Sequence, residues 1–278
     1  MKAAENAALW EGNAETWTRH ARAGYDIYRD ALNTPAFLAI LPSIRGLYGL
    51  DIGCGEGSNT RKLAERGARM QAIDVAPTFI RHARQTEEMH PLDIAYCVAD
   101  AQDLPFADAS FDFATAFMSL MDVPESDRAL REAHRVLRRN GFLQFSICHP
   151  CFAPPYRKVL RDANDSVRAI EVGGYFDDTD GRVDRWWFTT VPKAERERVP
   201  PFATPIFHRT LSSWVAIIRD AGFDIEAFGE PCASAELAAV EPVVADTRVA
   251  PLFLHIRIRK PLARRLQRRQ NPGQDEGN

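Results

Sequence analysis

Short apolar runs alternate with helix-like segments through the first half of the chain. Apolar runs of strand length stand at 47–50, 69–73, 94–98, 111–117 and 142–148. Helical patterns stand between several of them, at 58–66, 77–88 and 124–139. Pro77 suits a first helical turn, and Gly67 and Gly141 suit helix ends. This alternation predicts an α/β fold in which helices cover both faces of a mostly parallel sheet.

The alternation stops between residues 150 and 208, where prolines and glycines stand among many aromatic residues. An insertion of this length is typical of a lid over a site, and we expect it to follow the fifth strand. A short antiparallel extension without an active role is the alternative. Regular patterns resume with a helix at 210–222 and strands at 223–228 and 252–258.

Composition and charge narrow the class of protein. The chain has 278 residues, 45% of them hydrophobic, and a formal net charge of −3. The charge gives no reason to expect nucleic acid or an anionic membrane as a partner. Five irregularly spaced cysteines, no membrane-length apolar run and no signal-peptide pattern at the N-terminus favour a cytoplasmic protein. The basic and polar tail, 261–278, is expected to fray, and its arginines favour a solvated helix end over an RNA contact.

The stretch "LDIGCGEG" places three glycines directly after the first predicted strand. Glycine lets a ligand approach the backbone without a Cβ clash. The third glycine comes one residue too early for the dinucleotide fingerprint, and the loop lacks the lysine of a phosphate-binding loop. Glu56 would also repel a pyrophosphate. A ligand without a phosphate therefore suits this acidic loop better.

Further side chains follow the next strands. Asp74 ends the second strand, 21 residues after Gly53, where a carboxylate can accept both hydroxyls of an adenosine ribose. Asp100 ends the third strand and, with the backbone of Ala101, is placed to read an adenine edge. Helix capping is the alternative for both aspartates, and core packing is the alternative to purine contact for Phe79.

These motifs in this order resemble class I S-adenosylmethionine-dependent methyltransferases, and most closely the small-molecule type of ubiquinone and menaquinone biosynthesis. The further motifs are "IDVAPTFIRHAR", "VADAQDLPF", "SFDFATAFMSLMDV" and "EAHRVLRRNGFLQFSICHP". The resemblance implies a Rossmann-like seven-stranded sheet with six parallel strands and an antiparallel hairpin formed by the last two. It implies a cofactor site, for S-adenosyl-L-methionine and its product S-adenosyl-L-homocysteine, made by Asp51, Gly53, Cys54, Gly55, Asp74, Val75, Phe79, Asp100, Ala101, Phe117 and Met118.

The remaining expectations concern the acceptor side. The domain proper is expected at 46–260, with residues 1–45 as a helical cap over the cofactor crevice. Tyr25 and Tyr28 either close over the methionyl end or merely pack the cap. His149 is the first candidate for a general base, because it follows the fifth strand, and His208 is the second. Arg209 either holds an acidic substrate or pairs with a surface carboxylate.

The resulting hypothesis is an enzyme that methylates O, N or C of a small-molecule metabolite by in-line displacement. An RNA or protein methyltransferase and a non-catalytic cofactor-binding or partner-binding protein are the alternatives. The "CHPC" stretch at 148–151 lacks a partner pair for zinc, and we expect no metal.

Overall fold

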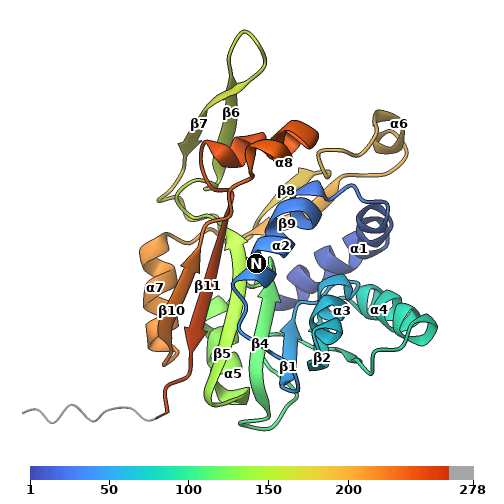
Figure 1. Ribbon diagram of the computed structural model, residues 1–278, viewed down its shortest axis with the longest axis vertical. Coiled ribbons are helices and arrows are strands. Elements are labelled where there is room, and N and C mark those ends of the chain that lie inside the picture. The colour runs from blue at the N-terminus through green and yellow to red at the C-terminus, as the bar shows by residue number, and fades with distance from the viewer. Residues whose placement is uncertain (263–278) are drawn as a thin grey trace, which may run out of the picture.

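One seven-stranded sheet organises the computed structural model, which describes residues 1–262 (Figure 1). The strand order is β10–β11–β5–β4–β1–β2–β3. The bounds are β1 Tyr48–Ile52, β2 Arg69–Asp74, β3 Ala95–Val98, β4 Phe111–Phe117, β5 Leu137–Cys148, β10 Asp224–Gly229 and β11 Phe253–Arg259. The parallel pairs run from β3 to β5, whereas β11 is antiparallel to both β5 and β10. The predicted arrangement of six parallel strands and one antiparallel strand is confirmed.

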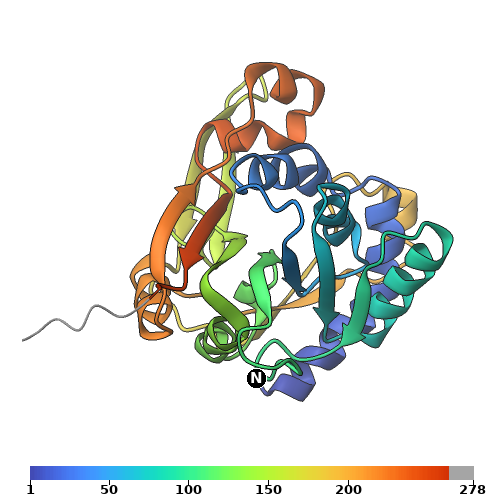
Figure 2. The same cartoon turned by 60° about the horizontal axis from the view of Figure 1, so that its bottom comes forward.

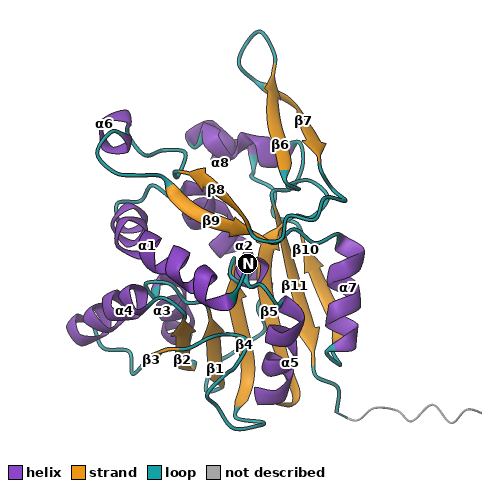
Figure 3. Cartoon of the chain, turned by 180° about the vertical axis from the view of Figure 1, so that it is seen from behind, coloured by secondary structure: helices purple, strands orange, loops and turns teal. Residues whose placement is uncertain are grey.

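Each face of the sheet is covered by a different pair of helices (Figure 3). On one face, α5 (Ser126–Val136) and α7 (Leu211–Asp220) bury Leu130 and Trp214 against the apolar side chains of the central strands. On the other face, α3 (Ser58–Glu65) and α4 (Pro77–Met89) bury Leu63 and Ile80. The apolar residues at helical spacing in the sequence therefore mark the faces that the sheet covers.

The predicted helix over 124–139 and its stop at Gly141 are wrong in their bounds. Helix α5 ends at Val136, and Leu137 already begins β5. Leu137 pairs with Phe111, and the register between β4 and β5 shifts before Phe142 pairs with Phe113. Gly141 lies inside β5, where a Cβ would meet the carbonyl oxygen of Asp112 at 2.8 Å. The prediction was too long because Leu137 keeps the helical spacing of the apolar residues, although it is buried as the first residue of β5.

The N-terminal segment consists of α1 (Ala3–Arg22), the π-helical turn η1 (Tyr28–Asn33) and α2 (Thr34–Ala39). Helix α1 runs along α4, as Figure 2 shows. Sheet side chains hold α2, because Gln144 donates to the carbonyl oxygen of Phe37 at 2.7 Å and Arg257 donates to that of Ile40. Thr34 also bonds Asn59 at the start of α3, at 3.1 Å.

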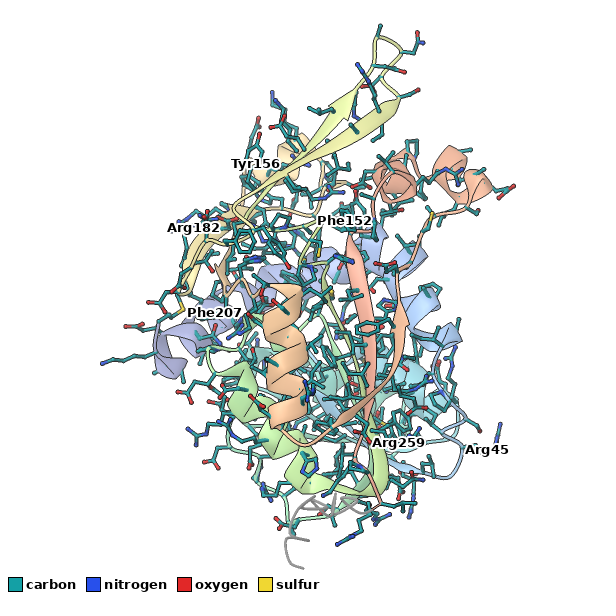
Figure 4. The ribbon with its side chains drawn as sticks, turned by 90° about the vertical axis from the view of Figure 1, so that its left-hand side faces the viewer. Arg45, Phe152, Tyr156, Arg182, Phe207 and Arg259 are labelled. Atoms are coloured by element: carbon teal, nitrogen blue, oxygen red, sulfur yellow. The ribbon has the colours of Figure 1, made fainter. Side chains whose placement is uncertain are left out.

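The insertion after β5 forms two antiparallel hairpins. The first pairs β6 (Tyr156–Arg161) with β7 (Val167–Gly173), and Figure 4 shows Phe152 and Tyr156 near the base from which it projects. The second pairs β8 (Arg182–Trp186) with β9 (Phe202–Ile206) and holds the short helix α6 (Lys193–Arg196) between them. It packs on α1, where Asn13 exchanges two hydrogen bonds with the backbone of Ala203, at 2.8 and 2.9 Å. The cap and the insertion are thus one connected layer.

The remaining helical elements are η2 (Leu120–Asp122), α8 (Ala235–Val240) and η3 (Pro242–Arg248). Among residues 1–262, no helix combines the length and the apolar character that crossing a bilayer requires. The predicted tail at 261–278 lies almost entirely outside the described residues.

Two glycines of the loop after β1 allow a matched stability test. Gly53 and Gly55 both have positive φ, at +71° and +56°. A Cβ on Gly53 would lie 2.4 Å from the Cβ of Ser119, whereas a Cβ on Gly55 would meet open space. We expect Gly53→Ala to lower the free energy of unfolding by about 2–5 kcal/mol, from strain and overpacking together, and Gly55→Ala by about 1–2 kcal/mol, from strain alone. Urea denaturation measures both, and equal losses would contradict the steric explanation.

Candidate functional site

A cavity of about 690 Å³ opens at the carboxyl ends of β1, β2, β3 and β4. Its floor includes Gly53, Asp74, Ala99 and Phe117, each at or just beyond the end of one of these strands. The cap and the insertion supply the other walls. The volume lies within the roughly 300–1,000 Å³ of small-molecule sites, and the location is the one where parallel α/β sheets bind ligands.

The glycine loop forms the edge of this cavity nearest to α3. Gly53, Gly55 and Gly57 all have left-handed backbone conformations, with φ of +71°, +56° and +87°. The N–H groups of Gly53 and Cys54 both donate to the carbonyl oxygen of Ile73, which brings the loop over the end of β2. Because Gly55 carries no side chain, its backbone is open to a ligand on the cavity side.

Asp51 and Asp74 hold this loop in place. Asp51 is buried and accepts hydrogen bonds from the hydroxyls of Thr60 at 2.6 Å and Thr115 at 2.8 Å. Asp74 accepts from the N–H groups of Gly55 at 2.8 Å and Ala76 at 2.9 Å. Burial raises the pKa of each carboxyl group to about 6, although these hydrogen bonds act in the opposite direction. Both carboxylates line the cavity.

The residues after β3 form a second polar corner. The carboxylate of Asp100 accepts from the backbone N–H of Gln102 at 2.8 Å and from its side-chain amide at 3.0 and 3.1 Å. Ala101 lines the cavity between them. Asp100 therefore shapes this turn, and its position beside Ala101 is the one expected for a group that reads an adenine edge.

Apolar residues separate these polar corners, and the structure brings Val75, Phe79, Phe117 and Met118 to the cavity wall as the sequence predicted. Phe79 also packs with Trp10 and Trp17 of α1. Phe117 lies against Phe37, with ring centroids 3.9 Å apart. Met118 has a φ of +51°, an uncommon conformation for a residue with a side chain, and its N–H donates to Ser146. Backbone strain of this kind occurs preferentially at functional sites.

The two candidate histidines differ in their surroundings. His149 is buried and does not line the cavity. Its Nδ1 accepts from the N–H of Cys151 at 3.1 Å, and its Nε2 lies 2.8 Å from the carboxylate of Glu230, so the contacts favour a structural role. His208 lines the cavity, and its Nε2 donates to the carbonyl oxygen of Tyr175 at 2.9 Å. That hydrogen bond leaves the neutral ring of His208 with Nδ1 as an acceptor.

Tyr25, Tyr28 and Arg209 also line the cavity, and the side-chain polar groups of Tyr28 and Arg209 have protein partners. The hydroxyl of Tyr28 bonds the carbonyl oxygen of Val243 at 2.6 Å and Asp246 at 2.9 Å. The backbone of Tyr25 accepts a hydrogen bond from Thr190. The guanidinium of Arg209 donates to the carbonyl oxygens of Phe207, Val123 and Pro124, so it ties α7 and the insertion to the segment after β4.

One carboxylate at the cavity wall was missed from the sequence. Asp122 ends η2, just after β4, and its side chain accepts no hydrogen bond from any residue in 1–262. Burial raises its pKa well above the ordinary value, and the charge of Arg209 only partly opposes this. The position of Asp122 in "MSLMDVP" was the available signal, but only the fold brings this residue to the cavity wall.

The cap and the insertion contribute two further polar atoms that the sequence did not mark. Oδ1 of Asn6 in α1 and Nε1 of Trp187 in the insertion are buried without a hydrogen-bond partner among the described residues. Both residues line the cavity, together with Phe207, which Figure 4 labels. Unpartnered buried polar atoms beside a cavity are expected where a polar ligand completes the hydrogen bonding. The part of the chain that the structure describes contains no cluster of three or more side chains able to hold a metal ion.

Comparison with known proteins agrees with this geometry. Residues 50–145 match a family described as "Methyltransferase domain". Over this range the chain resembles a methyltransferase domain. The matched range begins in β1 and ends in β5, so it includes the glycine loop, Asp74 and Asp100. The family and the fold imply the use of S-adenosylmethionine.

The chain is similar to methyltransferases from several organisms. A malonyl-[acyl-carrier protein] O-methyltransferase of Pseudescherichia vulneris is 34% identical over 140 residues, which are 50% of this chain and 52% of the relative. Methyltransferase GfsG of Streptomyces halstedii is 37% identical over 129 residues, 45% of this chain and 43% of the relative. The chain spans about half the length of the curated relatives it matches.

A solved structure extends the similarity beyond the matched range. An S-adenosylmethionine-dependent methyltransferase from Mesorhizobium loti is 27% identical, with a TM-score of 0.65. The similarity covers 81% of this chain and 96% of that one.

The residues that line the cavity suit the chemistry of this cofactor. The open side of Gly55 admits a ligand against the backbone, and the carboxylates of Asp74 and Asp100 stand at two neighbouring strand ends. Apolar side chains lie between them, as an adenosine requires. The pairing of Glu56 with Arg22 at 3.4 Å and Arg29 at 3.9 Å neutralises the charge from which we expected pyrophosphate to be repelled. The argument against a phosphate-containing ligand therefore depends on the missing lysine and the glycine spacing, and not on Glu56.

We expect Asp74→Ala to weaken the binding of S-adenosylhomocysteine by about 1–3 kcal/mol, because ribose hydroxyls would lose their acceptor. Isothermal titration calorimetry measures the dissociation constant. Adenosine and 2′,3′-dideoxyadenosine, compared on wild type and variant, separate this contact from a disturbed loop. A penalty of the same size for both nucleosides would assign Asp74 to the loop alone.

Proposed function

We propose that the protein transfers a methyl group from S-adenosylmethionine to a small-molecule acceptor, with an oxygen nucleophile as the first candidate. The observation that carries this proposal is one cavity with two differently built halves. The glycine loop, Asp74 and Asp100 form the half proposed for the cofactor, and η2, the insertion and the residues before α7 form the other half. The names of several relatives as O-methyltransferases support an oxygen acceptor.

The size of the acceptor follows from the walls. The second hairpin of the insertion packs on α1 and contributes Trp186 and Ile206 to the cavity, while the cap contributes Tyr28 from the opposite side. A hydrogen bond from Thr190 to the backbone of Tyr25 joins these two walls at 2.7 Å. An aromatic-rich chamber between two connected segments favours a small, partly apolar acceptor over a nucleic acid.

The cofactor supplies an activated methyl group on a sulfonium, so the protein's task is alignment and the exclusion of water. The aromatic residues of the cap and the insertion exclude water from the acceptor half. A hydroxyl acceptor must also lose its proton as it attacks. Asp122 and His208 both line the cavity with a free acceptor atom, whereas both ring nitrogens of His149 have protein partners. We assign the role of proton acceptor to Asp122, because it lines the cavity and its side chain accepts no hydrogen bond from residues 1–262.

A labelling experiment tests the activity. The protein is incubated with methyl-labelled cofactor and fractionated metabolites, and a labelled small product is expected. A labelled product only in the RNA or protein fraction would overturn the proposed acceptor class. Binding of the cofactor without a labelled product in any fraction would indicate a non-catalytic protein.

We expect Asp122→Asn to slow transfer to the labelled acceptor by about 10²-fold or more, the usual effect of removing a general base. The rate of the wild type should rise with pH through the raised pKa of Asp122, because only the carboxylate accepts a proton, and the variant should lack this rise. His149→Gln is the control outside the cavity and should leave the pH profile unchanged. If Asp122→Asn kept the wild-type pH profile of the rate and His208→Gln lost it, His208 would be the general base instead.

A further inference from the structure

One arginine of the first hairpin lines the acceptor half of the cavity. The hairpin rises beyond the carboxyl end of β5 (Figure 1), and Arg157 belongs to its first strand, β6. Arg157 lines the cavity together with Pro154 and Pro155, and its side chain is only 16% exposed. A charged group so far removed from water needs partners, either on the protein or on a ligand.

The protein fixes one part of this guanidinium and leaves another part open. Nη2 of Arg157 donates to a carboxylate oxygen of Asp246 at 2.7 Å, and Nε donates to the carbonyl oxygen of Phe152 at 3.1 Å. Nη1, which carries two N–H donors, has no acceptor among residues 1–262. A planar group that is held at two nitrogens and open at the third is suited to bind a planar anion.

Asp246 in η3 supports this arrangement from behind. Its side chain is 3% exposed, and its other oxygen lies 2.9 Å from the hydroxyl of Tyr28 in the cap. The first hairpin, the cap and η3 therefore meet at the ion pair of Arg157 and Asp246. Because Asp246 already offsets the charge of Arg157, the pair is poorly suited to a phosphate with two negative charges. A singly charged carboxylate matches the open nitrogen better.

Arg157 and the proposed proton acceptor lie near the same strand end. The N–H of Cys148, the last residue of β5, donates to the sulfur of Met121 at 3.1 Å, so η2 lies against this strand end. Burial and the charge of Asp122 raise the pKa of the Cys148 thiol to about 12, and the charge of Arg157 partly opposes them. Both charges thus act on one residue of the cavity wall.

We propose that the methyl acceptor carries a carboxylate, which Arg157 binds while the acceptor's hydroxyl lies at Asp122. This proposal rests on the proposed function and specifies its substrate class as hydroxycarboxylic acids. The carboxylate takes no part in the transfer. The hydroxyl oxygen gains the methyl group, the hydroxyl proton passes to Asp122, and the product keeps its carboxylate. Arg157 therefore selects among the hydroxyl compounds that are small enough to enter the cavity.

The labelled product tests this substrate class without a variant. Wild-type protein is incubated with methyl-labelled cofactor and fractionated metabolites, and the exact mass of the labelled product is measured before and after carbodiimide coupling to ethylamine. The coupling converts each carboxylate to an amide. We expect the product to gain at least one amide and to release no labelled methanol in mild alkali, because the new bond is an ether and not an ester.

The other results of this experiment have different meanings. A labelled product that gains no amide has no carboxylate and would overturn the proposal, although the proposed methyl transfer would stand. Release of labelled methanol would show that a carboxylate is itself methylated, and it would overturn the proposal as well. The lack of a labelled product in any fraction would overturn the proposed function, on which this substrate class depends.

Arg161 provides a matched control for the role of Arg157. It lies further along β6, its Nη1 donates to the carbonyl oxygen of Asp165 at 2.7 Å, and it does not line the cavity. Arg161→Gln thus removes an arginine from the same strand without removing a group from the proposed carboxylate site.

Steady-state kinetics with the purified acceptor and its ethylamide test Arg157 itself. In the wild type we expect the KM of the acceptor to be about 10- to 100-fold below that of the amide, with kcat within about threefold. Arg157→Gln should remove this difference by raising the KM of the acceptor, and Arg161→Gln should keep it. An equal loss for both compounds in Arg157→Gln would assign Arg157 to the structure of the hairpin. If that variant does not fold, Arg157→Lys keeps the charge but not the planar fork, and an unchanged ratio of the two KM values would overturn the proposal.

Discussion

The closing of the glycine loop over the end of β2 is the constraint on which the site depends. Two N–H groups of the loop share the carbonyl oxygen of Ile73, and Asp74 accepts the N–H of Gly55. These bonds require left-handed backbone at Gly53 and Gly55, where a side chain would be strained. At Gly55 the cavity side of the loop carries no side chain. A ligand can therefore lie against the backbone at the point where parallel strands end.

The buried aspartates connect this loop to the rest of the domain. Asp51 joins β1 to α3 through Thr60 and to β4 through Thr115. Asp74 joins β2 to the loop. Both have a raised pKa because burial disfavours the charged form, so each must be held by several donors. The acidic character of the site is thus partly structural, and the charges left for a ligand are fewer than the sequence suggests.

The cap and the insertion convert an open crevice into a chamber. Asn13 bonds the backbone of Ala203 twice, and Trp17 packs on Phe202 and Phe188. These contacts join segments about 190 residues apart in the chain. Because the layer rests on both the glycine loop and α4, the shape of the acceptor half depends on the position of the cap.

The sequence by itself determined the alternation of strands and helices, the glycine loop and the residues that end β2 and β3, because these depend on local spacing and on which residues tolerate left-handed backbone. It did not determine where α5 ends, since Leu137 suits a helix face and a strand equally. Only the tertiary structure decided which side chains face the cavity. His149 follows the expected strand, but its side chain contacts Glu230. Asp122 instead lines the cavity from the short helical turn η2, which no periodic pattern in the sequence predicts. Side-chain direction at the end of a strand depends on contacts between distant segments, and no local pattern records them.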